Sequence, residues 1–293
     1  MPENLPQTED VNPRTLGLDQ LASVELAELL IDEQRYAVDA ALAQAVPIAQ
    51  AIDAISERLL RGGRLHYVGA GTSGRLSFLD ASEMPPTFGT PPDLVCAHIA
   101  GGTGALIRAV EGAEDDADAG RRELRDHARA GDVVVGVSAS GTAAFVIGAL
   151  EEARLQGVWT IALANSARSP LAAAADAAIV VQTGPEPLTG STRLKAGTSQ
   201  KIVLNTISTG VMIRLGKTYD NLMVDVVPTN RKLRKRATRL VMQLSSLDEA
   251  RAQALLAEAG SVKTAVIMAR RGIDAASARI HLEKHHGSLR ASL

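Results

Sequence analysis

The chain has 293 residues, with 31 Lys and Arg against 33 Asp and Glu and a formal net charge of −2. This length allows one large domain or two moderate domains, each with its own apolar core. The nearly balanced charge excludes a global field that would draw the chain to nucleic acid or an anionic membrane, and the single cysteine excludes a disulfide framework.

The N-terminal segment MPENLPQTEDVNP has neither the basic region nor the apolar core of a secretory signal. No window holds the roughly 18 consecutive apolar residues that a transmembrane helix needs. We therefore expect a cytoplasmic protein. Residues 21–60 keep apolar side chains at helical spacing, which predicts a helical arm over 1–60, with Pro47 marking a kink or the start of a second helix.

Five short apolar runs with strand character follow the arm. They are RLHYVGAG (64–71), DLVCAHIAG (93–101), DVVVGVSAS (132–140), GVWTIALAN (157–165) and AAIVVQTG (177–184). Helical patterns such as TAAFVIGALEEARLQG separate the runs. This alternation predicts an α/β domain over 61–246, built on a doubly wound parallel sheet that is covered on both faces.

The sequence becomes helical again from Ser191, and a basic helix in TNRKLRKRATRLVMQLS follows the extended segment NLMVDVVP. With 2% aromatic residues there is little to stack on nucleobases, so this basic helix is interpreted as a solvated face. The composition changes again at Leu247. Residues 247–293 predict a small C-terminal subdomain of three short helices, separated at Gly260 and Gly272.

A glycine-rich loop follows the first predicted strand. Gly69, Gly71 and Gly74 match G-x-G-x-x-G at a strand-to-helix turn. A dinucleotide site also needs an acidic residue about 20 residues further on, at the end of the second strand, to hold the ribose hydroxyls. The second strand ends in CAHIAGG without a carboxylate, so the pattern does not predict a nicotinamide or flavin cofactor.

Hydroxyl groups make this loop better suited to a phosphate. A second strand ends in a similar loop, SASGT, and two loops of one type indicate one ligand. Backbone N–H groups at a helix N-terminus form an anion site together with Ser and Thr hydroxyls. The predicted sugar-phosphate ligands are Gly71, Thr72, Ser73, Ser138, Ser140, Gly141 and Thr142. The alternative is that both loops are ordinary turns whose Ser and Thr residues cap helices.

Two glutamates are candidates for general acid and base. Glu83 lies where the helix after the first loop is predicted to end, shortly before Pro85 and Pro86. The partial negative charge of a helix C-terminus and burial behind the prolines both favour the protonated carboxyl, as a general acid requires. Glu114, in the acid-rich segment EGAEDDADAG, is the better base. The alternatives are a satisfied helix-end carboxylate and a solvated run of charges.

Other motifs predict no further chemistry. His281 and His285 are four residues apart on a predicted helix, but no third ligand lies at the spacing of a zinc site, so no metal site is predicted. The sequence contains neither the G-x-S-x-G elbow of a triad hydrolase nor the phosphate loop of a P-loop kinase.

The segments GAGTSGRLSFLDASEMPPTFG, AVEGAEDD, TGSTRLKAGTSQKIVLNTISTGVMI and NLMVDVV closely resemble the N-acetylmuramic acid 6-phosphate etherase family, which is built on the sugar isomerase (SIS) domain. The resemblance runs from about residue 8 to the C-terminus. It implies a cytoplasmic homodimeric lyase without a cofactor that releases D-lactate and leaves N-acetylglucosamine 6-phosphate. It places the family's acid and base on Glu83 and Glu114.

The second loop departs from that family. Similar members read SASGRTPY, whereas this chain has SASGTAAF, with Thr142 in place of Arg and Ala143 in place of Thr. Three alternatives to the etherase function stay open. They are a non-catalytic sugar-phosphate sensor similar to the glucokinase regulatory protein, a SIS-type transcription regulator, and an aldose–ketose phosphate isomerase. The acidic arm VELAELLIDEQ lacks the basic recognition helix that a regulator needs.

Overall fold

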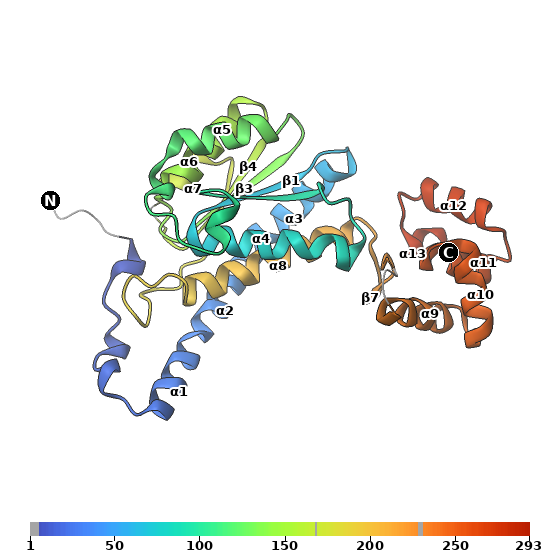
Figure 1. Cartoon of the computed structure of the whole chain (residues 1–293), viewed down its shortest axis with the longest axis horizontal. Coiled ribbons are helices and arrows are strands. Elements are labelled where there is room, and N and C mark those ends of the chain that lie inside the picture. The colour runs from blue at the N-terminus through green and yellow to red at the C-terminus, as the bar shows by residue number, and fades with distance from the viewer. Residues whose placement is uncertain (1–5, 168, 228–230) are drawn as a thin grey trace. The chain divides into compact units, whose positions relative to one another are not determined.

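The computed structural model describes residues 6–167, 169–227 and 231–293 (Figure 1). The chain forms two compact units. Unit 1 consists of Met1–Ala81 and Asp93–Ser208, and unit 2 consists of Ser82–Pro92 and Thr209–Leu293. Pro228, which ends the predicted extended segment, and the first two residues of TNRKLRKR lie outside the described residues.

Unit 1 is built on a five-stranded parallel sheet with the order β2-β1-β3-β4-β5. The strands are β1 (Leu65–Gly69), β2 (Val95–Ile99), β3 (Val133–Ser138), β4 (Trp159–Ala164) and β5 (Ala177–Val180). All five predicted strands are confirmed. From β1 the chain adds β2 on one side of the sheet and β3, β4 and β5 on the other side. The loops after β1 and β3 therefore lie at the topological switch point, where ligands bind in such sheets.

Helices cover both faces of the sheet, as Figure 1 shows. An apolar cluster that includes Val68, Val134, Leu124 and Leu150 packs α5 and α6 on one face. On the other face lie α3, α4 and α8 (Figure 1). The bounds of these helices are α3 (Ala45–Leu60), α4 (Gly71–Phe88), α5 (Ala117–His127), α6 (Ala144–Leu155) and α8 (Lys195–Arg214), with the short α7 (Pro170–Ala174) before β5.

The predicted N-terminal arm consists of α1 (Ser23–Glu33), α2 (Arg35–Leu42) and α3. Pro47 lies in the first turn of α3, where a missing N–H has no intrahelical partner to lose. The prediction that it marks a helix start is therefore correct, but the break between α1 and α2 was not predicted. No single helix among the described residues is long and apolar enough to cross a membrane; the arm passes that test only as a pair bent by 59°.

A buried ion pair holds the arm against the start of α8. The Glu33 carboxylate accepts hydrogen bonds from Lys195 Nζ at 2.8 Å, Asn12 Nδ2 at 2.9 Å and Arg14 Nε at 2.8 Å. The side chains of Glu33 and Lys195 are 0% and 3% exposed. Burial disfavours the charged carboxylate, but the hydrogen bonds from Lys195 and Arg14 outweigh it and hold the pKa of Glu33 below its ordinary value.

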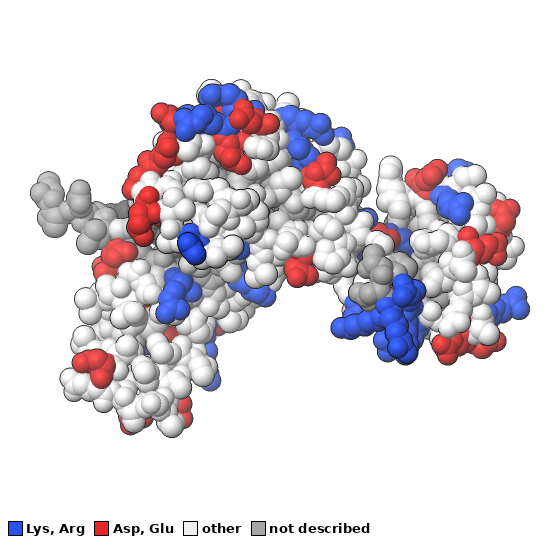
Figure 2. Space-filling view, in the orientation of Figure 1, with Lys and Arg blue, Asp and Glu red and all other residues white. Residues whose placement is uncertain are grey.

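Unit 2 is helical. It comprises a short hairpin of β6 (Thr218–Tyr219) and β7 (Leu222–Met223), followed by α9 (Arg231–Ser245), α10 (Glu249–Ala259), α11 (Val262–Arg271), α12 (Ala275–Lys284) and α13 (Leu289–Ser292). Gly260 and Gly272 end α10 and α11 in the left-handed conformation, as predicted, but residues 247–293 form four helices rather than three, because the short α13 follows α12. The Lys and Arg side chains of α9 gather on one surface patch (Figure 2), and most of them are exposed.

The Glu33 network yields a test of what holds the arm. We expect Glu33→Gln to lower the free energy of unfolding by about 3–5 kcal/mol at pH 7, because it leaves the Lys195 charge buried without a partner. The folded pKa of Glu33 is lowered, so its stabilisation is complete above pH 4.5 and is lost as the pH falls below that value. The difference between wild type and variant should therefore shrink in acid. Urea unfolding followed by circular dichroism, at pH 7 and below pH 4.5, measures this difference in the free energy of unfolding. The control is Glu28→Gln, at an exposed position of the same helix. Equal stability of all three proteins at pH 7 would refute this role of Glu33.

Candidate active site

The first predicted loop lies at the turn from β1 to α4, where there is no room for side chains. A Cβ atom on Gly69 would lie 2.6 Å from the Gly74 backbone nitrogen, and one on Gly74 would lie 2.5 Å from Cγ1 of Ile99. Gly71, the first residue of α4, has φ of +52°. The glycines therefore pack the start of α4 tightly against β1 and β2, which directs its free N–H groups to the carboxyl edge of the sheet.

A buried chain of hydrogen bonds links this turn to the interior of unit 1. Ser73 Oγ donates to Gln200 Oε1 at 2.9 Å, and Gln200 Nε2 donates to Asn165 Oδ1 at 3.0 Å. Asn165 Nδ2 in turn donates to Ser199 Oγ at 2.8 Å. The Ser73 proton is thus engaged inside the protein, whereas its oxygen keeps lone pairs that can still accept a hydrogen bond. Thr72, beside it, is half-buried.

The second predicted loop, after β3, is held by its own hydroxyls. The Gly141 N–H donates to Ser138 Oγ at 3.1 Å, and the Thr142 N–H donates to Ser140 Oγ at 3.2 Å. Gly141 has φ of +75°, and a Cβ there would lie 2.0 Å from the Ser169 Cβ. The loop therefore requires glycine at 141. Thr142 is exposed at its tip, so its hydroxyl is accessible from solvent.

A pocket of about 170 Å³ opens at the ends of β1 and β2 in unit 1. Its floor is formed by the residues that follow the two strands, and its wall by the connection from β2 to α5. The lining residues are Ala70, Gly71, Arg75, Ala100, Ala105, Ala109, Val110, Glu111, Gly112, Ala113 and Glu114. The structure thus brings two of the predicted site residues, Gly71 and Glu114, into one pocket.

Glu114 lies in a short 3-10 turn, Ala113–Asp115, and its side chain is exposed. The neighbouring acid Asp116 is used structurally, because its Oδ1 accepts the Ala119 N–H at 2.8 Å and caps α5. The position of Glu114 at the pocket wall, open to solvent, suits a group that must exchange protons.

Glu83 departs from the prediction in two respects. α4 does not end before the prolines but continues through Pro85 and Pro86 to Phe88, and the Glu83 side chain is exposed rather than buried behind them. Met84 and Phe88, four residues apart, are buried, so packing of this apolar pair holds the helix despite the missing N–H groups. Glu83 belongs to unit 2 and Glu114 to unit 1.

Arg75 is a pocket residue that the sequence analysis did not identify. It lies one turn into α4, and its Nε donates to the Leu106 backbone carbonyl at 3.3 Å, which joins α4 to the pocket wall. A guanidinium near a helix N-terminus adds positive charge to an anion site. The signal in the sequence was a basic residue directly after the glycine loop.

These features define a class of protein, a SIS-domain protein with a polar site at its strand ends. Residues 47–154 match the model of the glucokinase regulatory protein N-terminal SIS domain, and residues 113–209 match the SIS domain model. A phosphoheptose isomerase from Francisella tularensis has a similar fold, with a TM-score of 0.52 and 19% identity, covering 66% of this chain and 100% of that chain.

Full-length relatives identify the family. The chain is 50% identical over 288 residues to the N-acetylmuramic acid 6-phosphate etherase of Yersinia pestis (strain Pestoides F), covering 98% of each protein. It is equally similar to that of Yersinia pseudotuberculosis serotype O:1b. This chain belongs to the N-acetylmuramic acid 6-phosphate etherase family.

The hydrogen-bond chain beneath the first loop can be tested by Gln200→Leu. We expect this variant to lower the free energy of unfolding by about 1–3 kcal/mol for each of the two buried partners that it leaves unsatisfied, Ser73 and Asn165. Thermal unfolding measures the change. Thr206→Ala is the matched control, because this exposed hydroxyl on α8 donates to a carbonyl of its own helix. If both variants melt at the wild-type temperature, the hydrogen bonds of Gln200 do not stabilise the loop between β1 and α4.

Proposed function

We propose that this chain is an N-acetylmuramic acid 6-phosphate etherase, a carbon–oxygen lyase. It cleaves the D-lactyl ether at C3 of the sugar by β-elimination followed by hydration, and the products are N-acetylglucosamine 6-phosphate and D-lactate. The observation that carries the proposal is 50% identity over 98% of the chain to enzymes with that name. The pocket at the strand ends, with a helix N-terminus and a glutamate, supports it.

The reaction needs one base and one acid. In the open-chain sugar, the C1 aldehyde acidifies the C2 proton, and the lactyl ether oxygen is on the β carbon. Glu114 takes the C2 proton and leaves an enolate, whose electron pair then forms the C2–C3 double bond as the C3–O bond breaks. Glu83 gives its proton to the departing lactate oxygen. Water then adds across the double bond: Glu83 takes a proton from the water as its hydroxyl joins C3, and Glu114 returns its proton to C2. Both carboxyl groups are thereby restored to their starting states.

The phosphate group is proposed to bind between the two loops at the switch point. Gly71, Thr72 and Ser73 contribute the N-terminus of α4, and the loop after β3 contributes Ser138, Ser140, Gly141 and Thr142. The N–H groups of an uncapped helix start attract a phosphate dianion, and hydroxyls complete its hydrogen bonds. Arg75, from the next turn of α4, supplies a cation on the same side.

We also propose that the protein works as a cytoplasmic homodimer. Val38, Leu42 and Val46 of the arm are 52%, 71% and 68% exposed, and they adjoin an apolar groove of about 320 Å³ that Ile202 of α8 also lines. Apolar surface of this kind is stabilised when a second copy covers it. A phosphorylated sugar crosses a bilayer poorly because its charge is costly to desolvate, which supports an intracellular site of action.

A non-catalytic sensor is the second candidate, because residues 47–154 match a domain of the glucokinase regulatory protein. A sensor binds the phosphosugar and releases no lactate. An isomerase is separated by mass, since it converts its substrate without loss of a fragment.

The assigned roles are tested with N-acetylmuramic acid 6-phosphate in D₂O, with lactate assayed and C2 of the sugar followed by NMR. Wild type should release lactate and place deuterium at C2. Glu114→Gln should lose both, whereas Glu83→Gln should keep C2 exchange and lose about 10²–10⁴-fold in lactate release. Asp115→Asn, which changes the adjacent exposed carboxylate, should retain wild-type rates.

Binding without lactate or exchange in the wild type would establish the sensor. Full lactate release by both glutamate variants would show that the chemistry lies on other residues.

A further inference from the structure

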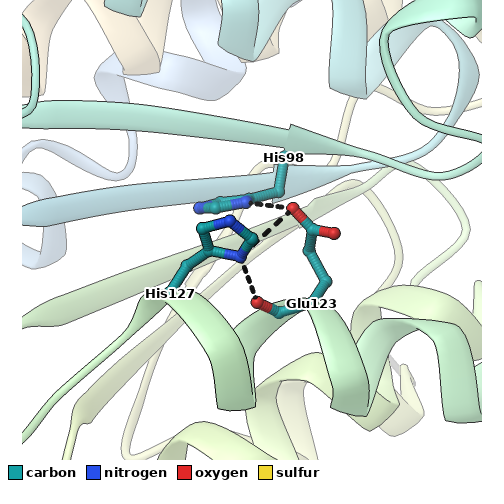
Figure 3. A group of neighbouring side chains, drawn as sticks. All are labelled: His98, Glu123 and His127. Atoms are coloured by element: carbon teal, nitrogen blue, oxygen red, sulfur yellow. Dashed lines mark hydrogen bonds and ion pairs between the residues drawn. The ribbon is translucent and has the colours of Figure 1, made fainter.

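Two histidines and a glutamate that the proposed chemistry does not use lie together in unit 1 (Figure 3). His98 comes from β2, and Glu123 and His127 are one turn apart near the end of α5. His98 Nδ1 lies 2.7 Å from Glu123 Oε1, and the potential ligand atoms of all three residues lie within 4.8 Å of one another. Their side chains are 6%, 39% and 54% exposed, so the group opens to solvent on the side of His127.

Further hydrogen bonds fix the orientation of both rings. His127 Nδ1 donates to the Glu123 backbone carbonyl at 2.7 Å, which leaves Nε2 with a lone pair. His98 Nε2 lies 3.0 Å from Nδ1 of the buried His66, whose Nε2 lies 3.2 Å from Asp132 Oδ2. Histidines that bind metal commonly have their other nitrogen held by a carbonyl or a carboxylate in this way.

Asp132 sets the tautomers along this chain. Burial disfavours its charge, but hydrogen bonds from the Arg64 side chain and backbone outweigh it and lower the pKa of Asp132, so it is an ionised acceptor. His66 Nε2 faces the Asp132 carboxylate, which only accepts, so Nε2 carries the proton; in the neutral ring Nδ1 is then an acceptor for the His98 Nε2–H.

The contact between His98 Nδ1 and Glu123 Oε1 is then left without a hydrogen between its two atoms. In the tautomer that carries its proton on Nε2, His98 presents a lone pair on Nδ1 to a carboxylate oxygen 2.7 Å away. Two acceptors at this distance repel unless a cation lies between them, either an extra proton or a metal ion. His127 adds a third potential ligand nitrogen to the same group.

We propose that His98, Glu123 and His127 form a binding site for a divalent transition-metal ion, with Zn²⁺ the best match. The ligands are His98 Nδ1, the Glu123 carboxylate and His127 Nε2. Two imidazoles and one carboxylate are a ligand set that zinc accepts, with water in the fourth position, and imidazole nitrogens disfavour Ca²⁺ and Mg²⁺. The spacing of Glu123 and His127 places both ligands on one face of α5, as in other helix-borne zinc sites.

The site lies outside the pocket but on the same connection. His98 comes immediately before the segment that links β2 to α5, and Glu123 and His127 come after it; Glu114 lies in between. A metal ion would tie the two ends of this segment together. Its expected effect is structural, since none of its ligands lines the pocket.

Calorimetric titration of the EDTA-treated full-length protein with ZnCl₂ tests the site. We expect one Zn²⁺ per chain and a melting temperature that rises with Zn²⁺ concentration. Glu123→Gln and His127→Gln, at half-exposed positions that tolerate substitution, should each weaken binding at least about tenfold, and His66→Leu should weaken it about 10–100-fold. Co²⁺ bound in place of Zn²⁺ should give visible absorption bands that Glu123→Gln abolishes.

The matched control is the double variant His281→Gln/His285→Gln, which removes two histidines at four-residue spacing near the end of α12. Its Zn²⁺ affinity should equal that of the wild type. The proposal is overturned if no Zn²⁺ binds, if Glu123→Gln and His127→Gln bind as tightly as the wild type, or if ¹⁵N NMR at saturating Zn²⁺ shows protons on both nitrogens of His98. None of these outcomes depends on lactate release.

Discussion

The close approach of α4 to the sheet is the constraint on which the site depends. Gly69 and Gly74 leave no space for side chains between the end of β1, the start of α4 and Ile99 of β2. Because the helix begins so near the strand ends, its unpaired N–H groups lie at the carboxyl edge of the sheet rather than in a longer loop. The same packing brings Gly71 and Arg75 to the pocket that Glu114 lines. A side chain at Gly69 or Gly74 would push α4 away from the sheet and separate the proposed phosphate-binding helix start from Glu114, the proposed base.

α8 holds this arrangement through buried polar contacts. Along one helix, Lys195 pairs with Glu33 of the arm, Gln200 bonds Ser73 of the first loop, and Asn205 Nδ2 donates to Asp80 Oδ1 of α4 at 2.5 Å. An apolar helix of the same shape would pack as well, but it would tolerate rotation and sliding. Each buried donor or acceptor left without its partner destabilises the folded protein by about 1–3 kcal/mol. Each of these contacts therefore favours one position of α8 over the others. The site therefore rests on specificity of packing as much as on the amount of apolar surface buried.

Local patterns in the sequence predicted the strands and several helix ends, whereas they could not predict contacts between residues far apart in the sequence. The five strands are apolar runs between turn residues, and Gly260 and Gly272 end helices by a local rule, so these predictions are confirmed. The continuation of α4 through two prolines depends on burial of Met84 and Phe88, which no local rule reveals. His98 lies 25 residues from Glu123, and Ser73 lies 127 residues from Gln200. Sequence spacing pointed instead to His281 and His285, for which no third ligand was found.

The connection between β2 and α5 combines freedom with restraint. Gly101, Gly102 and Gly112 all have positive φ, which gives the segment backbone conformations that other residues adopt with strain. Arg75 holds its middle through the Leu106 carbonyl, and Asp116 caps the helix that follows. If Glu114 is the base, as proposed, such a segment lets it adjust to a substrate whose ring opens, yet a positioned base loses effect when it moves freely. Tying β2 to α5 beyond both ends of the segment limits this freedom without occupying the pocket, which gives the histidine and glutamate cluster a role separate from the chemistry itself.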